Sequence, residues 1–181
     1  MTDEELVRKI VKNNNMMLFE ILYDRYSQII YNKCYGFSKS SAEAQDLTQD
    51  VFLQLFVKLG SFKGNSKFSS WVFSFTYNFC VNYVNRNKGR KISDKSDSIS
   101  DDNDRLSVYI DDDSVLEMRA GKLKKALELI EPEDKTILLL KYQDDVSIKE
   151  LAMLMNIGES AVKMRLKRAK ARIAEVYNKI A

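Results

Sequence analysis

Basic side chains recur along one stretch near the end of the chain, where they could contact DNA. Lysine and arginine bind phosphate oxygens and the edges of guanine bases. In a helix that buries Val162 and Leu166, the residues around these two positions would turn outward as one set. We predict that this set reads DNA: Ser160, Ala161, Lys163, Met164, Lys167 and Arg168.

The residues around this stretch have the pattern of a helix-turn-helix. Ala152 is small where two helices would cross, and Asn156 falls where the turn needs a left-handed backbone, which asparagine tolerates. Ile157 would fill the angle between the helices, and Val162 and Leu166 would pack the second helix on the first. This pattern favours DNA binding; an ordinary amphipathic hairpin with a solvated basic face is the alternative.

The residue types present do not favour an enzyme. The chain has no histidine, which is the commonest general base and the commonest zinc ligand. It shows neither a phosphate-binding loop with Gly-Lys-Ser/Thr nor a nucleophile elbow. Cys34 and Cys80 lie in helical patterns and are predicted to be buried free thiols. We expect no catalytic residue, no metal, no cofactor and no small-molecule substrate.

The residues predicted to contact DNA must be positioned by helices, because the composition is typical of an all-α protein. The chain has 181 residues with one proline and six glycines, and helix-forming residues dominate whole stretches. Helical spacing predicts a first group of helices, with breaks at the asparagines 13–15, at Gly36 and at a loop over 62–68. A capping pattern at Ser40–Glu43 predicts the start of the third helix of this group. Capping patterns at Ser114–Glu117 and Ser147–Glu150, and a proline restart at Pro132, predict a second group.

A change in composition separates the two groups of helices. The net charge is only +3, but residues 86–95 and 163–172 are basic and residues 97–113 are acidic. The acidic stretch holds too few apolar residues to offset the entropy of ordering it. We therefore predict two small helical domains, at 1–91 and 114–181, joined by a flexible acidic linker at 92–113.

Two features of the sequence bear on the cellular location of the protein. Residues 3–5 are acidic, and no apolar run follows a basic start, so a secretory signal is not expected. The longest aliphatic run, 137–140, is far too short to cross a bilayer. We expect a cytoplasmic protein without membrane insertion.

Three blocks of the first domain give a specific family resemblance. They are Phe19–Tyr23 with Tyr26, Ala44–Phe52, and Phe62–Gly64 followed by Phe68–Val72. Residues 19–90 resemble region 2 of the sigma-70 family, most closely that of the extracytoplasmic-function group, which keeps only regions 2 and 4. Residues 123–174 resemble region 4, and 162–169 match the end of its recognition helix. The resemblance implies an alternative sigma factor that binds core RNA polymerase, recognises promoters and helps to melt them.

The resemblance also implies partners and a polymerase-binding face. In the third expected helix, acidic and amide residues share one side, which the resemblance places on the clamp helices of the β′ subunit: Glu43, Asp46, Gln49, Asp50 and Gln54. A solvated acidic face is the alternative. The expected partners are the β and β′ subunits of core RNA polymerase, promoter DNA and an anti-sigma factor. The acidic linker would thread through the polymerase channel, or would simply keep the segment soluble.

Unpaired bases of the minus-ten element would contact the end of the first domain. Trp71, Phe75 and Phe79 lie at i, i+4 and i+8, so we predict that they belong to the core. We expect DNA contacts from polar residues and helix ends: Ser66, Lys67, Tyr77, Asn78, Asn82 and Arg86. In relatives, the asparagine matching Asn78 lies in a loop that takes a flipped base; a helix cap is the alternative role.

The predicted turn departs from its relatives, and other protein classes remain open. Residues 158–161 read Gly-Glu-Ser-Ala where relatives often have Ser-Glu-Gly-Thr, so no promoter sequence can be carried over. A stand-alone regulator would instead dimerise and bind palindromic DNA. A helical adaptor would use its basic faces to bind acidic proteins.

Overall fold

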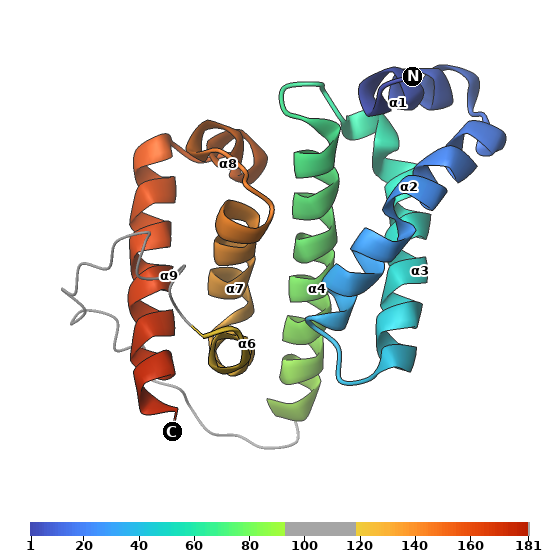
Figure 1. The fold of residues 1–181 in the computed structure, drawn as a ribbon. Helices are drawn as coiled ribbons and strands as arrows, with labels where there is room; N and C mark the ends of the chain where they lie inside the picture. Colours follow the sequence, from blue (N-terminus) through green and yellow to red (C-terminus); the bar gives the residue numbers. More distant parts are fainter. Residues whose placement is uncertain (93–118, 181) are drawn as a thin grey trace.

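The computed structural model describes residues 1–92 and 119–180, and these residues form helices and turns with no strand among them. Helices α1 to α4 form a first domain and α6 to α9 form a second, with α4 and α7 side by side where the domains meet (Figure 1). The prediction of an all-α fold with two helical domains is confirmed. The predicted linker lies outside the described residues except at Ile92, and so does the Ser114–Glu117 capping pattern.

The first domain packs its helices around one apolar core. The helices are α1 (Asp3–Asn13), α2 (Met16–Tyr35), α3 (Ser41–Lys58) and α4 (Phe68–Ile92), with a 3-10 turn, η1, at Leu59–Ser61. The core includes Leu6, Leu22, Ile30, Leu47, Val51, Leu55, Phe68 and Val72. Cys34 and Cys80 are confirmed as buried free thiols, with 3.8 Å between their sulfur atoms.

Local signals explain most helix boundaries in this domain. Asn14 takes the left-handed backbone that ends α1, and the Asn15 side chain accepts hydrogen bonds from the first amides of α2. Ser40 caps α3 by accepting a hydrogen bond from the Glu43 amide. The capping box predicted there is only half formed, because the Glu43 carboxylate accepts from the Lys39 amide and not from that of Ser40.

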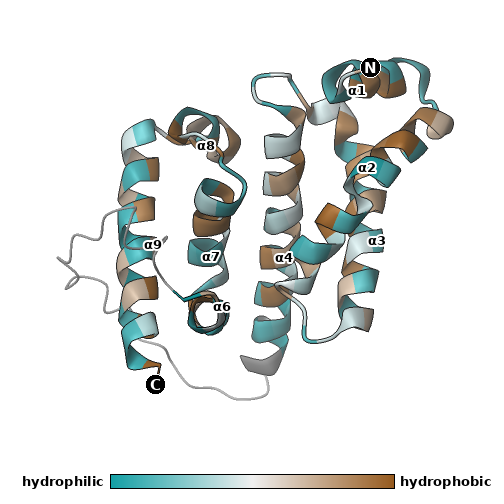
Figure 2. Cartoon of the chain, viewed as in Figure 1, coloured by the Kyte–Doolittle hydropathy of each residue, from teal (hydrophilic) through white to brown (hydrophobic). Residues whose placement is uncertain are grey.

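The second domain is built from shorter helices around a second core. It contains α6 (Ala120–Leu129), α7 (Pro132–Leu138), a π turn, η2 (Leu139–Gln143), α8 (Ile148–Met155) and α9 (Glu159–Lys179). Pro132 begins α7 as predicted, since its missing amide hydrogen is not needed at a helix start. Hydrophilic and hydrophobic residues alternate along α9, as expected for a helix with one buried side (Figure 2).

The two domains share an interface along α4. Helix α4 packs against α7 and also contacts η2 and α8. Tyr77, in the middle of α4, is buried in the core of the second domain, and Phe37 and Phe73 pack against the same core. The sequence did not predict this contact, which fixes how the two domains face each other.

The left-handed backbone at Asn156 generates a prediction about stability. Asn156 has φ = 53°, a conformation in which asparagine and glycine are tolerated and a Cβ without a polar group is not. We expect Asn156→Ala to lower the free energy of unfolding by about 1 kcal/mol, measured by urea denaturation. Asn156→Gly is the matched control and should cost less than Asn156→Ala. Equal losses for both variants would contradict a role for the left-handed turn.

Candidate nucleic-acid interface

The predicted helix-turn-helix is present in α8 and α9. Ser147 and Glu150 form a complete capping box at the start of α8, and Asn156 ends that helix in the left-handed conformation. Val162 is fully buried and Leu166 is 5% exposed, so both pack α9 on the rest of the domain. The turn therefore fixes α9 across α8 with one side in the core and the other facing solvent.

The outward side of α9 carries all the residues predicted to read DNA. Each of them is exposed: Ser160, Ala161, Lys163, Met164, Lys167 and Arg168. Gly158 caps the helix without a side-chain hydrogen bond, so the first amides of α9 are not occupied by a capping side chain. Free amides at a helix start and an adjacent row of cations suit a DNA backbone.

A second polar surface surrounds the start of α4. Ser66 is half-buried and Lys67 is exposed in the loop 62–67, and Gly64 there has φ = 73°. Glu4 of α1 accepts a hydrogen bond of 3.1 Å from the Phe68 amide and so caps α4 from another helix. This hydrogen bond is the main reason why the pKa of Glu4 lies below its usual value of 4.5.

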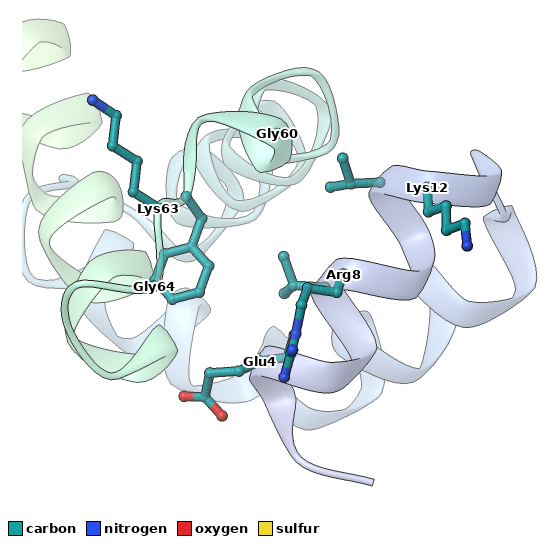
Figure 3. A pocket seen from close by; sticks show the side chains of 9 residues that line it. Glu4, Arg8, Lys12, Gly60, Lys63 and Gly64 are labelled. Atoms are coloured by element: carbon teal, nitrogen blue, oxygen red, sulfur yellow. The ribbon is translucent and has the colours of Figure 1, made fainter.

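A pocket of about 580 Å³ lies between α1 and this loop. Figure 3 shows Arg8 and Lys12 on one wall and Lys63 on the other, with Glu4 at the edge. The lining holds three cationic residues and one carboxylate, and the side chains of Lys12 and Lys63 extend away from the pocket (Figure 3), so this end of the first domain is basic. Its position beside the loop extends the polar surface at the start of α4.

Three residues predicted to contact the minus-ten element form an exposed row on α4. Asn78, Asn82 and Arg86 are spaced by four residues and all face solvent. The expectation that Asn78 lies in a loop or caps a helix is wrong, because it lies inside α4. The loop before α4 contains a different asparagine, Asn65, which is exposed.

Tyr77 is not available to DNA in this structure. It is only 1% exposed, and its hydroxyl accepts a hydrogen bond of 3.0 Å from the Lys33 ammonium. Burial raises the pKa of Tyr77 far above its usual value. The sequence pattern suggested an amphipathic ring at the surface, but the second domain covers that side of α4. Trp71, Phe75 and Phe79 pack against the first core, as predicted.

The predicted polymerase-binding residues lie on α3. Asp46, Gln49, Asp50 and Gln54 are exposed along its outward side. Glu43 differs, because it is half-buried and accepts a hydrogen bond of 2.6 Å from the Tyr83 hydroxyl. That hydrogen bond is the main reason why the pKa of Glu43 is lowered. Glu43 therefore ties α3 to α4 and is less free to contact a partner than the other four.

Two apolar residues on the same side of α3 were missed by sequence reasoning. Leu53 is 67% exposed and Val57 is 72% exposed. The helical repeat offered a signal, since Leu53 follows Asp46 by seven residues and Asp50 by three. The sequence analysis did not single out these two residues, and they extend the exposed acidic face with an apolar end.

No group of three or more His, Cys, Asp or Glu residues among the described residues could hold a metal ion. None of the helices in that part of the chain is both long enough and apolar enough to cross a membrane.

Comparison with protein families decides between the classes that the helix-turn-helix left open. The model of sigma-70 region 2 matches residues 22–90, and the model of sigma-70 region 4 matches residues 120–173. The chain belongs to the sigma-70 family. Because its two matched regions are those that the extracytoplasmic-function group keeps, it is an alternative sigma factor that recognises promoters.

Solved structures agree with the fold of this sigma factor. The sigma factor RpoE from Bartonella quintana, solved with the anti-sigma factor NepR, is 19% identical with a TM-score of 0.61, over 90% of this chain and 98% of that one. CnrH, solved with the cytosolic domain of CnrY, is 16% identical with a TM-score of 0.65, over 99% of both chains. A comparison with curated proteins gave no significant match.

The cap on α4 generates a prediction about pH. Because the pKa of Glu4 is lower in the folded protein than its usual 4.5, Glu4 stabilises the fold above that pH and loses this effect as the pH falls through the lowered value. We expect Glu4→Ala to lower the free energy of unfolding by about 1 kcal/mol at neutral pH, with the difference shrinking below pH 4. Glu20→Ala, which removes an exposed carboxylate from α2, is the control and should change the free energy of unfolding by less than about 0.5 kcal/mol.

Proposed function

We propose that α9 reads the minus-thirty-five element of the promoter in the major groove. The observation that supports this most is the exposed row of Lys163, Lys167 and Arg168 on the side of α9 opposite the buried Val162 and Leu166. An α-helix fits the major groove, and lysine and arginine there reach guanine edges and phosphates. Ser160, Ala161 and Met164 complete the contacting side and set the base preference.

The first domain captures unpaired bases of the minus-ten element at the loop 62–67 and along α4. Asn65 and Ser66 offer hydrogen-bonding groups at the loop, and Lys67 offers a cation. Asn78, Asn82 and Arg86 continue this surface along α4. Holding unstacked bases on the protein offsets the few kcal/mol that unstacking each step costs, and this favours melting.

Core RNA polymerase binds the outward side of α3. Asp46, Asp50 and Gln54 provide charge and hydrogen bonds there, while Leu53 and Val57 provide apolar area. Charged groups in such a contact set its register and association rate, and the apolar residues supply most of the affinity. The polymerase carries out the bond-forming chemistry, and this chain directs where it starts.

An anti-sigma factor is the proposed inhibitor of this protein. The sigma factor RpoE from Bartonella quintana was solved with an anti-sigma factor, and CnrH was solved with the cytosolic domain of CnrY. In this chain the partner would act on the two matched regions together.

The promoter-directing function is tested by transcription with core polymerase on genomic DNA, with mapped start sites. Start sites that do not depend on this chain would contradict the proposed function.

Leu53 tests the polymerase contact. We expect Leu53→Ser to weaken binding to core polymerase by about 1–2 kcal/mol, because an exposed leucine loses its apolar contact. The measurement is titration of labelled chain with core polymerase. Leu129→Ser is a matched control, since Leu129 is also 67% exposed but lies in the second domain, on α6. Equal losses in both variants would exclude α3 as the contact.

Lys163 tests the promoter contact. We expect Lys163→Ala to weaken minus-thirty-five recognition by about 1–3 kcal/mol while polymerase binding stays intact. Promoter binding by the reconstituted holoenzyme measures the loss, with Lys125→Ala on α6 as the control for removing one exposed cation. Release of the Lys163→Ala chain from core polymerase would show that the roles of the two domains are assigned wrongly.

A further inference from the structure

One exposed side chain on α9 is apolar although it lies among cations. Met164 is 49% exposed, and Lys163 and Lys167 are exposed beside it. Ala161, one turn before Met164, is exposed as well. Ala161 and Met164 therefore form a short apolar strip on the outward side of a helix whose other exposed residues there carry charges or a hydroxyl group.

Met164 lies at the middle of this outward side. An α-helix turns by about 100° per residue, so Met164 points about 160° away from both Val162 and Leu166. These two residues are buried and mark the side of α9 that faces the core. Among the exposed residues of α9, Met164 is thus placed directly opposite the core.

Cations flank this middle position on both sides. Lys163 and Lys167 lie on one flank of the outward side, and Arg165 and Arg168 lie on the other; all four are exposed. A helix in the major groove has a phosphate backbone along each flank and base edges opposite its middle. The long cationic side chains therefore suit the phosphates, whereas Met164 faces the bases.

The chemistry of Met164 limits which base it can recognise. Its thioether sulfur is only a weak hydrogen-bond acceptor, and the rest of the side chain is apolar. In the major groove, guanine, adenine and cytosine present hydrogen-bonding groups, and thymine alone adds a methyl group. An apolar side chain gains by removing that methyl group from water, and it leaves the polar edges of the other bases without a partner.

The residue one turn earlier on the same row does not narrow the choice of base. Ser160 lies four residues before Met164 and is exposed. A serine hydroxyl both donates and accepts hydrogen bonds, so it suits several base edges. The selectivity at the middle of α9 therefore depends on Met164.

We propose that Met164 recognises the 5-methyl group of a thymine in the minus-thirty-five element, so that this element places an A·T pair opposite the middle of α9. The inference rests on the proposed function of α9 and adds the base that one of its residues selects. Ala161 extends the same apolar surface toward the start of the helix.

Uracil in place of thymine tests this contact, because deoxyuridine pairs as thymidine does and lacks only the methyl group. The probe is a promoter identified by the mapping of start sites, and each thymine of its minus-thirty-five element is replaced in turn, on both strands. Binding is measured with holoenzyme reconstituted from core polymerase and the full chain. We expect one position at which uracil weakens binding by about fourfold, as for the loss of one buried methyl group.

Variants of Met164 connect that position to this side chain. With Met164→Ala, the thymine and uracil probes should bind equally well, whereas Met164→Leu should keep most of the difference because leucine is also apolar and similar in volume. Met153→Ala is the matched control and should keep the full difference, since Met153 is 42% exposed but lies on α8. Lys163→Ala should weaken binding to both probes and also keep the difference, because it removes a charge and not the methyl contact.

The outcomes separate this inference from the proposed function. If a scrambled minus-thirty-five element weakens binding but no uracil does, α9 reads the promoter without the thymine methyl group and the inference is overturned. It is also overturned if Met164→Ala keeps the fourfold difference, because another residue then contacts the methyl group. If scrambling the element leaves binding unchanged, the proposed function of α9 fails and the inference fails with it.

Discussion

The contact of one buried ammonium group with two domains determines how the parts of this protein face each other. Lys33 lies on α2, and the groups around its ammonium come from α4 of its own domain and from Asp144 of the other. A charge without a partner in that place would be costly, so the domains pack in the register that brings Asp144 to it. Burial of Tyr77 and the hydrogen bond from the Lys67 amide to the Glu150 carboxylate both occur in that register.

An ion pair makes a contact that opens more readily than an apolar one. An interface of apolar side chains alone would expose them to water on opening, whereas separated Lys33 and Asp144 recover hydration. The π turn η2 places Asp144 for this contact, because the Asp144 amide bonds to the Leu139 carbonyl five residues earlier. Such turns are frequent at functional positions in helices. The DNA-reading side of α9 stays exposed in this arrangement of the domains, so the helix itself is accessible.

Local features of this fold could be predicted from the sequence, and features that depend on distant residues could not. Asn156, Ser147 and Pro132 act within a turn of their own position, and each has the predicted role. Tyr77 was expected at the surface, but its burial depends on a domain that begins about forty residues later in the sequence. Lys33 and Asp144 are 111 positions apart, so no spacing rule relates them.

The residues of the candidate site could likewise be predicted from the sequence only where a local pattern marked them. The helical repeat placed the α9 contacts on one exposed side, because Val162 and Leu166 marked the other. On α3 the same repeat could have singled out Leu53 and Val57, which are exposed and continue the side of Asp46 and Asp50, but the sequence analysis did not use it there. Asn78 was assigned from family resemblance, and the structure shows that it lies inside α4, whereas Asn65 lies in the loop before that helix.

The distance between the domains, measured with spin labels on α3 and α9 before and after core polymerase is added, tests the central claim most directly. The free chain should give one short distance that fits the arrangement in Figure 1. The polymerase-bound chain should give a distance longer by tens of ångströms, because promoter elements about 25 base pairs apart, or about 85 Å of B-DNA, must be reached together. An unchanged short distance in an active complex, or a long distance in the free chain, would contradict the account.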